Sequence, residues 1–299
     1  MDEYHIPALL DQSIEGLNIN PNGIYVDVTF GGGGHARKIF SLLKKGHLIA
    51  FDQDQDAERN IIDHPNFHFV NHNFRYLTNF INYLGFEKVD GIIADLGVSS
   101  HHFNEASRGF SFRFNGPLDM RMNREATKTA ADVLNNHSEE SLIKIFRQYG
   151  ELKNAFGLTQ TILKERKEAE FNNIEDFVKR INPNIPKNGE HKYLAKVFQA
   201  LRIEVNDEMS ALEDFLTQLP NIINTEGRVV IITYHSLEDR MVKNYLKSDS
   251  FDGKIEKDLY GNTITSFKAI NRKVIIPSDE EIATNNRVRS AKMRIVEKI

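Results

Sequence analysis

The segment Asp27-Val28-Thr29-Phe30-Gly31-Gly32-Gly33-Gly34-His35 decides the fold class of this chain. The apolar residues 23–28 lead directly into four glycines, and residues 35–43 then carry apolar side chains at helical spacing. Glycines let a backbone approach a ligand closely, and the first turn of a helix has free N–H groups. The pattern therefore predicts a strand, a ligand-binding loop and a helix. The structural alternative is a glycine turn that only makes a tight corner.

A carboxylate follows this loop at an informative distance. Asp52 ends the next apolar run, residues 47–51, and lies twenty-one residues after Gly31. At that place a carboxylate can accept hydrogen bonds from both ribose hydroxyls, so we expect a nucleoside-containing cofactor. The spacing Gly31-x-Gly33-x-x-Ala36 also satisfies the dinucleotide fingerprint. These residues alone therefore fit either an NAD-dependent oxidoreductase or a methyltransferase.

The rest of the chain alternates apolar runs with helical patterns, except in the middle. This alternation predicts a doubly wound α/β sheet interrupted by a helical insertion. The predicted turn at residues 260–262 lies between two strand-like runs. We expect one domain from residues 1–106 and 206–299, and a helical domain from residues 107–205. Strands are expected at residues 23–28, 47–51, 66–70, 89–96, 227–234 and 291–296, and helices at 35–43, 76–84, 138–149, 174–181, 198–216 and 237–246.

Composition excludes several kinds of chemistry. The 299 residues include 38 Lys and Arg against 42 Asp and Glu, a net charge of −4, which still allows a local basic patch. The absence of cysteine excludes disulfides, thiolate metal sites and cysteine nucleophiles. No apolar run approaches the ~18 residues of a membrane span, and the first residues lack a signal-peptide pattern, so we expect a cytoplasmic protein without membrane partners. No metal site is expected, because Pro65 and a strand pattern argue against one helix carrying His64, His68 and His72.

Eight motifs occur in the order found in one family. Together they resemble the MraW/RsmH-type methyltransferases, which act on the cytosine N4 of small-subunit ribosomal RNA, and the resemblance covers nearly the whole chain. The motifs are HIPALL (residues 5–10), TFGGGGH (29–35), DLGVSS (95–100), RGFSF (108–112), GPLDMRM (116–122), FQALRIEVNDE (198–208), HSLEDR (235–240) and RVRSAK (287–292).

The resemblance implies a class I (Rossmann-like) methyltransferase domain with an inserted all-helical domain. It implies S-adenosyl-L-methionine as methyl donor and a P-site cytidine of 16S rRNA, in the small ribosomal subunit, as acceptor. The sequence leaves the oligomeric state, monomer or dimer, open. Where the family carries a glutamine after DLGVSS, this chain has His102, whose imidazole can also donate or accept a hydrogen bond. The implied cofactor contacts are Gly33, Gly34 and His35 in the loop, Asp52 at the ribose, Phe74 near the adenine, Asp95 after the fourth strand, and His102.

The implied acceptor is an exocyclic amine with a delocalised lone pair, which is a poor nucleophile. Catalysis then needs positioning and a hydrogen-bond acceptor at the amine N–H. Asp95 and His235 are the candidate catalytic residues by position. Their structural alternatives are a cap at the start of a loop and a histidine packed at the start of a helix, and Ser236 with Asp239 fits a capping box. Without cysteine, carbon-5 methylation through a thiolate adduct is excluded.

Two basic segments predict contacts with RNA. Residues 108–124 carry four arginines against one aspartate, interleaved with phenylalanines that can stack on unpaired bases. Residues 287–298 carry five cations against one glutamate. The alternatives are a hydrophobic hinge, a solvated strand face and, for the whole chain, a non-catalytic RNA-binding assembly factor. The predicted RNA-binding residues are Arg108, Phe110, Phe112, Arg113, Arg121, Arg287, Arg289 and Lys292.

Overall fold

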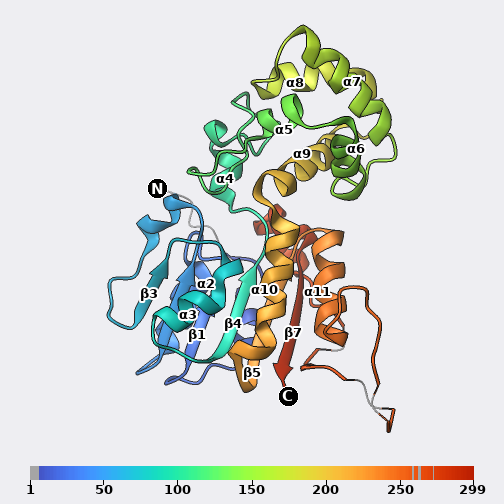
Figure 1. Ribbon diagram of the computed structural model, residues 1–299. Helices are drawn as coiled ribbons and strands as arrows, with labels where there is room; N and C mark the ends of the chain where they lie inside the picture. Colours follow the sequence, from blue (N-terminus) through green and yellow to red (C-terminus); the bar gives the residue numbers. More distant parts are fainter. Residues whose placement is uncertain (1–6, 258, 262–263, 272) are drawn as a thin grey trace. The chain divides into compact units, whose positions relative to one another are not determined.

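The computed structural model describes residues 7–257, 259–261, 264–271 and 273–299, and the chain forms two compact units (Figure 1). Unit 1 comprises Met1–Gly97 and Ser210–Ile299, and unit 2 comprises Val98–Met209. Unit 2 thus begins before the expected residue 107 because Val98 and Phe103 already pack against its core. It ends after the expected residue 205. His5 and part of the predicted turn at 260–262 lie outside the described residues.

Unit 1 contains a mixed sheet, with seven strands among the described residues. The strands are β1 (Ile24–Asp27), β2 (His47–Phe51), β3 (Phe67–Val70), β4 (Val89–Asp95), β5 (Ile223–Thr233), β6 (Phe267–Ala269) and β7 (Lys292–Lys298). Their order across the sheet is β3-β2-β1-β4-β5-β7-β6. Strands β1 to β5 pair with one another in parallel, whereas β7 is antiparallel to β5 and β6. This topology confirms the doubly wound, Rossmann-like α/β fold.

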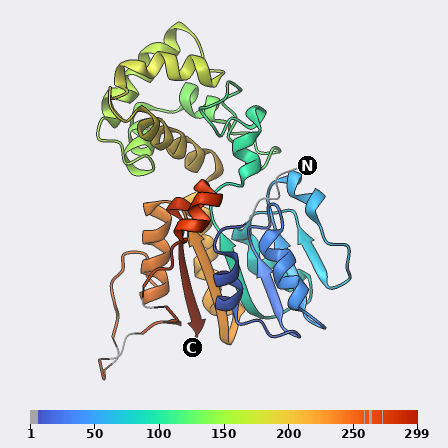
Figure 2. The same cartoon turned by 180° about the vertical axis from the view of Figure 1, so that it is seen from behind.

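Helices cover both faces of this sheet because its strands are apolar on both sides. In β2, Ile49 and Phe51 join one buried cluster, and Leu48 and Ala50 join the other. The first cluster lies under α3 (Leu77–Tyr83), α10 (Glu208–Ile222) and α11 (Ser236–Ser248), on the near face in Figure 1. The second lies under α1 (Leu10–Leu17) and α2 (Gly34–Leu42), on the near face in Figure 2.

The strand register brings four loops to one edge of the sheet. Asp27, the last residue of β1, is paired with Ala50 of β2 and Ile93 of β4. Asp95, the last residue of β4, is paired with Ile232 of β5. Because these strands are parallel, the loops after β1, β2, β4 and β5 all leave from the same carboxyl edge, where open α/β sheets bind ligands.

Unit 2 is helical, as expected, and its described residues form no strand, only an isolated bridge between Pro117 and Asn173. Ser138 caps α6, as the sequence predicts, and accepts a hydrogen bond from the N–H of Ser141. Helices α4 to α9 contribute apolar side chains to the core of the unit. Their bounds are α4 (Ser100–Asn104), α5 (Ala130–Asn136), α6 (Glu139–Gln148), α7 (Ala155–Glu168), α8 (Ile174–Ile181) and α9 (Glu190–Asn206).

The prediction of one long helix over residues 198–216 is wrong. Helix α9 ends at Asn206 and α10 begins at Glu208, because Asp207 adopts a left-handed backbone conformation with φ of 51°. The apolar spacing continues across the break, yet Val205 packs in the core of unit 2 and Leu212 in that of unit 1. Within the described residues, every helix is too short or too polar to cross a bilayer.

Candidate active site

The glycine loop connects β1 to α2. Gly33 has a left-handed φ of 75°, and a Cβ at Gly34 would lie 2.5 Å from Cγ of Pro7, so local structure requires glycine at both positions. Gly32 differs, because its φ is not left-handed and a Cβ there would meet no described atom within 4 Å. Neither strain nor packing explains a glycine at 32, whereas close approach of a ligand does.

Asp52 follows β2 and contacts this loop directly. Its Oδ2 accepts a hydrogen bond of 2.7 Å from the N–H of Gly31, and its Oδ1 accepts one of 2.8 Å from the N–H of Asp54. The carbonyl of Gly31 accepts a 2.9 Å hydrogen bond from the side chain of Asn60. The glycine loop and Asp52, which the sequence separates by twenty-one residues, therefore lie in direct contact, and the role of Asp52 at a ribose stays a prediction.

Phe74 lies at the start of a short helix, η2 (Phe74–Tyr76), which follows β3. Asn73 caps this helix by accepting a hydrogen bond from the N–H of Arg75. The half-buried ring of Phe74 packs edge-on against Phe215 of α10, with 5.4 Å between ring centroids. Phe74 is thus held in a fixed place at the same end of the sheet.

Asp95 is held by side chains from three neighbouring segments. Its Oδ1 accepts a 2.7 Å hydrogen bond from Oη of Tyr234, and its N–H donates one of 2.7 Å to Oγ1 of Thr29. Its Oδ2 lies 3.9 Å from Nδ1 of His35. Burial raises the pKa of Asp95 to about 7, although the hydrogen bond from Tyr234 opposes this rise. A carboxyl with such a pKa can take up a proton near neutral pH.

His35 and Asp27 lie buried beside Asp95. Nε2 of His35 is 3.0 Å from the carbonyl of Ala8 and must donate to it, so Nδ1 carries the lone pair of the neutral ring. Burial lowers the pKa of His35 and raises the pKa of Asp27 to about 6. His35 is 4% exposed. Its hydrogen bond to the carbonyl of Ala8 therefore holds the glycine loop against the residues that precede α1.

His235 is the N-cap of α11 and forms a capping box with Glu238. Its Nε2 lies 3.0 Å from Oε1 of Glu238. The proposed capping box of Ser236 and Asp239 is therefore wrong, because Asp239 instead pairs with Arg294 at 2.8 Å. The interpretation of His235 as a histidine at the start of a helix is confirmed, and its catalytic role stays a prediction.

Tyr234 was not among the predicted site residues, although it contacts Asp95. The position of Tyr234 in the sequence could have indicated this contact. A polar aromatic residue directly after the buried strand β5 must lie at the ligand edge of the sheet. Parallel pairing of Asp95 with Ile232 then brings residue 234 beside the end of β4.

His102, the predicted substitute for the family glutamine, belongs to unit 2. It is the third residue of α4 and forms a capping box with Ser99, whose N–H donates to Nδ1 of His102 at 3.2 Å. Its ring lies 4.7 Å from that of Phe110, and the residue is 7% exposed. The local helix cap therefore fixes the orientation of the imidazole.

Two of the predicted RNA-binding residues of unit 2 are buried, which corrects the prediction for them. Arg108 is 3% exposed and donates hydrogen bonds of 3.0 Å to the carbonyls of Arg121 and Met122. Phe110, 4% exposed, belongs to the core. The guanidinium and the ring hold the segment together internally, so they do not face a ligand.

The other predicted residues of this segment differ in exposure. Phe112 is half-buried and packs against Phe198, with 5.4 Å between ring centroids. Arg121 pairs with Asp119 at 2.7 Å, whereas Arg113 is exposed. Arg113 is therefore the best placed of these residues for an external partner.

The predicted basic residues of unit 1 lie near the start of β7. Arg287 and Arg289 are exposed on a short helix, η5 (Asn286–Ser290), directly before that strand. Lys292 opens β7 and pairs with Asp239 at 3.3 Å. All three thus lie at the end of the sheet that also carries Tyr234.

Comparison with known proteins identifies the family of this chain. The chain is 55% identical over 298 residues to ribosomal RNA small subunit methyltransferase H of Parabacteroides distasonis, covering 99% of this chain and 98% of that protein. It is 56% identical over 296 residues to the protein of that name from Phocaeicola vulgatus, covering 99% and 97%. A solved rRNA methylase from Streptococcus thermophilus is 13% identical, with a TM-score of 0.38 and coverage of 97% and 93%. The MraW methylase family matches residues 2–299, and the chain belongs to that family.

Proposed function

We propose that this methylase transfers a methyl group from S-adenosyl-L-methionine to the N4 amine of a P-site cytidine in 16S rRNA. Membership of a methylase family displaces the NAD-dependent alternative. Relatives at 51–56% identity are named ribosomal RNA small subunit methyltransferases, which supports ribosomal RNA as the substrate. The choice of the cytosine N4 rests on the eight ordered motifs. Because these relatives are bacterial proteins named for ribosomal RNA, we place the reaction in the cytoplasm.

The observation that carries the proposal is the pairing of Asp52 with the glycine loop at the carboxyl edge of the sheet. The carboxylate suits ribose hydroxyls, and the surface is open at Gly32. Bound there, the cofactor supplies an electrophilic methyl group. The residues of unit 1 that would hold it are Gly33, Gly34 and His35 at the start of α2, Asp52 at the ribose, Phe74 beside the adenine, and Asp95.

Asp95 is the group we assign to the amine of the acceptor. As the amine nitrogen forms its new bond, its N–H becomes more acidic, and a carboxylate that accepts this hydrogen bond lowers the barrier. Tyr234 occupies Oδ1 of Asp95, so the amine is assigned to Oδ2. We call Tyr234 a positioning residue because it acts through Asp95. His235 remains a second candidate, and its Nδ1 accepts a hydrogen bond from the N–H of Glu238 in the helix cap.

The test uses small ribosomal subunits that lack the modification. The protein and labelled S-adenosylmethionine are added, the RNA is digested, and the labelled nucleoside is identified and mapped by mass spectrometry. We expect N4-methylcytidine at one P-site position. A label at carbon 5 of cytosine or on another base would contradict the proposal. Subunit binding without incorporation would favour the non-catalytic assembly factor.

A further inference from the structure

A second depression lies in unit 1, beside the residues assigned to catalysis. Its volume is about 260 Å³, below the roughly 300–1,000 Å³ of pockets for drug-sized ligands. An occupant is therefore no larger than about one nucleotide. Three segments line it, all from the carboxyl end of β5 or the approach to β7: Tyr234, His235 and Ser236; Ile276, Pro277 and Ile282; and Arg289, Ser290, Ala291 and Lys292.

The lining combines an apolar surface with two cations. Ile276, Pro277 and Ala291 offer carbon surface for a flat ring, and Arg289 and Lys292 offer positive charge. No carboxylate is among the lining residues. Within the part of the chain that the structure describes, Arg289 forms no ion pair. This combination suits a nucleotide, which has an apolar face and an anionic phosphate.

Of the two cations among the described residues that line this pocket, one forms an ion pair and the other does not. Lys292 and Arg294 share the single carboxylate of Asp239, at 3.3 and 2.8 Å. Of the acidic residues at the start of α12 (Asp279–Thr284), Glu281 accepts a hydrogen bond from the N–H of Leu9 and does not line the pocket. Of the two cations that line the pocket, Lys292 shares Asp239 with Arg294, so Arg289 is the one that attracts a phosphate.

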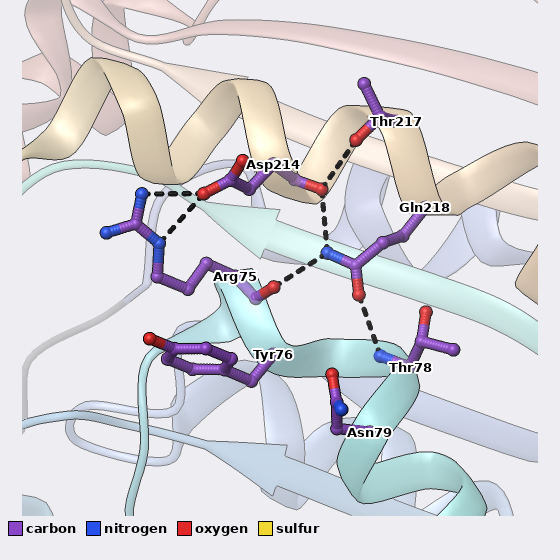
Figure 3. Close-up of a pocket in the computed structure, with 7 residues that line it drawn as sticks. All are labelled: Arg75, Tyr76, Thr78, Asn79, Asp214, Thr217 and Gln218. Atoms are coloured by element: carbon purple, nitrogen blue, oxygen red, sulfur yellow. Dashed lines mark hydrogen bonds and ion pairs between the residues drawn. The ribbon is translucent and has the colours of Figure 1, made fainter.

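A larger depression of unit 1, about 560 Å³, is less suited to bind a phosphate (Figure 3). There Arg75 is neutralised by Asp214 at 2.6 Å. The side chain of Gln218 bridges the N–H of Thr78 and the carbonyl of Arg75. The charges of Arg75 and Asp214 cancel, so this depression has no comparable attraction for RNA.

The smaller depression is next to Asp95 but separate from it. Tyr234 lines the depression and also donates the hydrogen bond to Oδ1 of Asp95. Asp95 itself does not line the depression, so a nucleotide seated there contacts Tyr234 and not the catalytic carboxylate. Resting on the proposed function, we infer that this pocket holds a nucleotide adjacent to the target cytidine, with its base on the apolar lining and its phosphate at Arg289 and Lys292.

The test compares the binding of purified protein variants to unmodified small subunits by co-sedimentation, a measurement that needs no turnover. Arg289→Ala removes one phosphate contact, and Ser290→Phe fills the pocket from an exposed position. We expect subunit affinity to fall about tenfold for each, with a shallower salt dependence for Arg289→Ala and unchanged affinity for S-adenosylmethionine. Lys45→Ala, which removes an exposed cation just before the amino end of β2, is the matched control and should bind as the wild type does.

The outcomes separate this inference from the proposed function. If both pocket variants bind subunits normally while the wild type produces N4-methylcytidine, the pocket is not a nucleotide site and the function stands. If both variants lose affinity and the wild type methylates another atom, the pocket stands and the function does not. Equal loss of affinity in Lys45→Ala would show a general charge effect and overturn the pocket assignment.

Discussion

Two regions were predicted to contact ligands: the glycine loop, residues 27–35, and the basic aromatic segment, residues 108–124. Their predicted contact residues differ in where they lie in the structure. At the loop, the predicted acid Asp52 bonds to Gly31 at the ligand edge of the sheet. In the segment, Arg108 and Phe110 are buried. The difference teaches that spacing relative to strand ends predicts where a side chain lies more reliably than a composition of arginines and phenylalanines.

The physical reason lies in what each residue type can do elsewhere. A carboxylate after a parallel strand stays at one edge whatever packs around it. A phenylalanine can pack in a hydrophobic core as well as stack on a base. An arginine can donate hydrogen bonds to backbone carbonyls as well as bind a phosphate. Arg108 does this for Arg121 and Met122.

The largest effect should come from Asp95→Asn. The amide keeps the size of the side chain but cannot take a proton, so we expect the single-turnover rate of methylation to fall by about 10²–10⁴. Affinity for S-adenosylmethionine by calorimetry should change much less, and the thermal melting curve serves as a control for folding. A wild-type rate would show that Asp95 has no part in the transfer, and the ligand edge would then lose its assigned acceptor.

Arg108→Ala should cost about 3 kcal/mol of unfolding free energy, because it leaves two buried carbonyls without their charged donor. The matched variant Arg113→Ala, at an exposed position, should cost less than about 0.5 kcal/mol yet weaken binding to small subunits. Urea unfolding and co-sedimentation measure the two effects. Equal stabilities would break the distinction between buried and exposed arginines in this segment.

Asp52→Ala should weaken binding of S-adenosylmethionine by about 1.5–3 kcal/mol, the usual loss for a charged hydrogen bond. Isothermal titration measures this affinity. Asp63→Ala removes an exposed carboxylate of the same loop region and should leave the affinity unchanged. If the two variants bind the donor equally well, Asp52 serves only to hold the glycine loop.

The smallest effect is the pH dependence. The pKa of Asp95 is raised to about 7, so its ionised fraction, and with it the methylation rate, should rise about tenfold between pH 6 and 8. Tyr234→Phe removes a hydrogen bond that favours the ionised carboxylate and should move the midpoint to higher pH. His35, Asp27 and Glu238 are the other titratable groups near Asp95. An unshifted midpoint in Tyr234→Phe would exclude a positioning role through this hydrogen bond.

Stability should change with pH in the opposite direction. Because the pKa values of Asp95 and Asp27 are raised above their unfolded values, the folded state keeps protons that the unfolded state has lost. Their contribution to stability is therefore greatest below about pH 4 and is lost as pH rises to about 7. Urea unfolding of Asp95→Asn between pH 5 and 8 should show a weaker decline than the wild type.

The sequence by itself determined the fold class, the positions of the glycine loop and Asp52, and the helical nature of the middle segment. These features depend on local patterns: apolar runs, glycines, and polar residues at the ends of strands. Each pattern has few structural solutions once the strands are parallel.

Only the tertiary structure decided which side chains meet. Tyr234 and Asp95 lie 139 positions apart and touch because β4 pairs with β5. The apolar period of residues 198–216 gave no sign of the break at Asp207, because residues on either side pack into different cores. Contacts between distant residues depend on register and on which surface is already covered, and neither is encoded in the local spacing of residues.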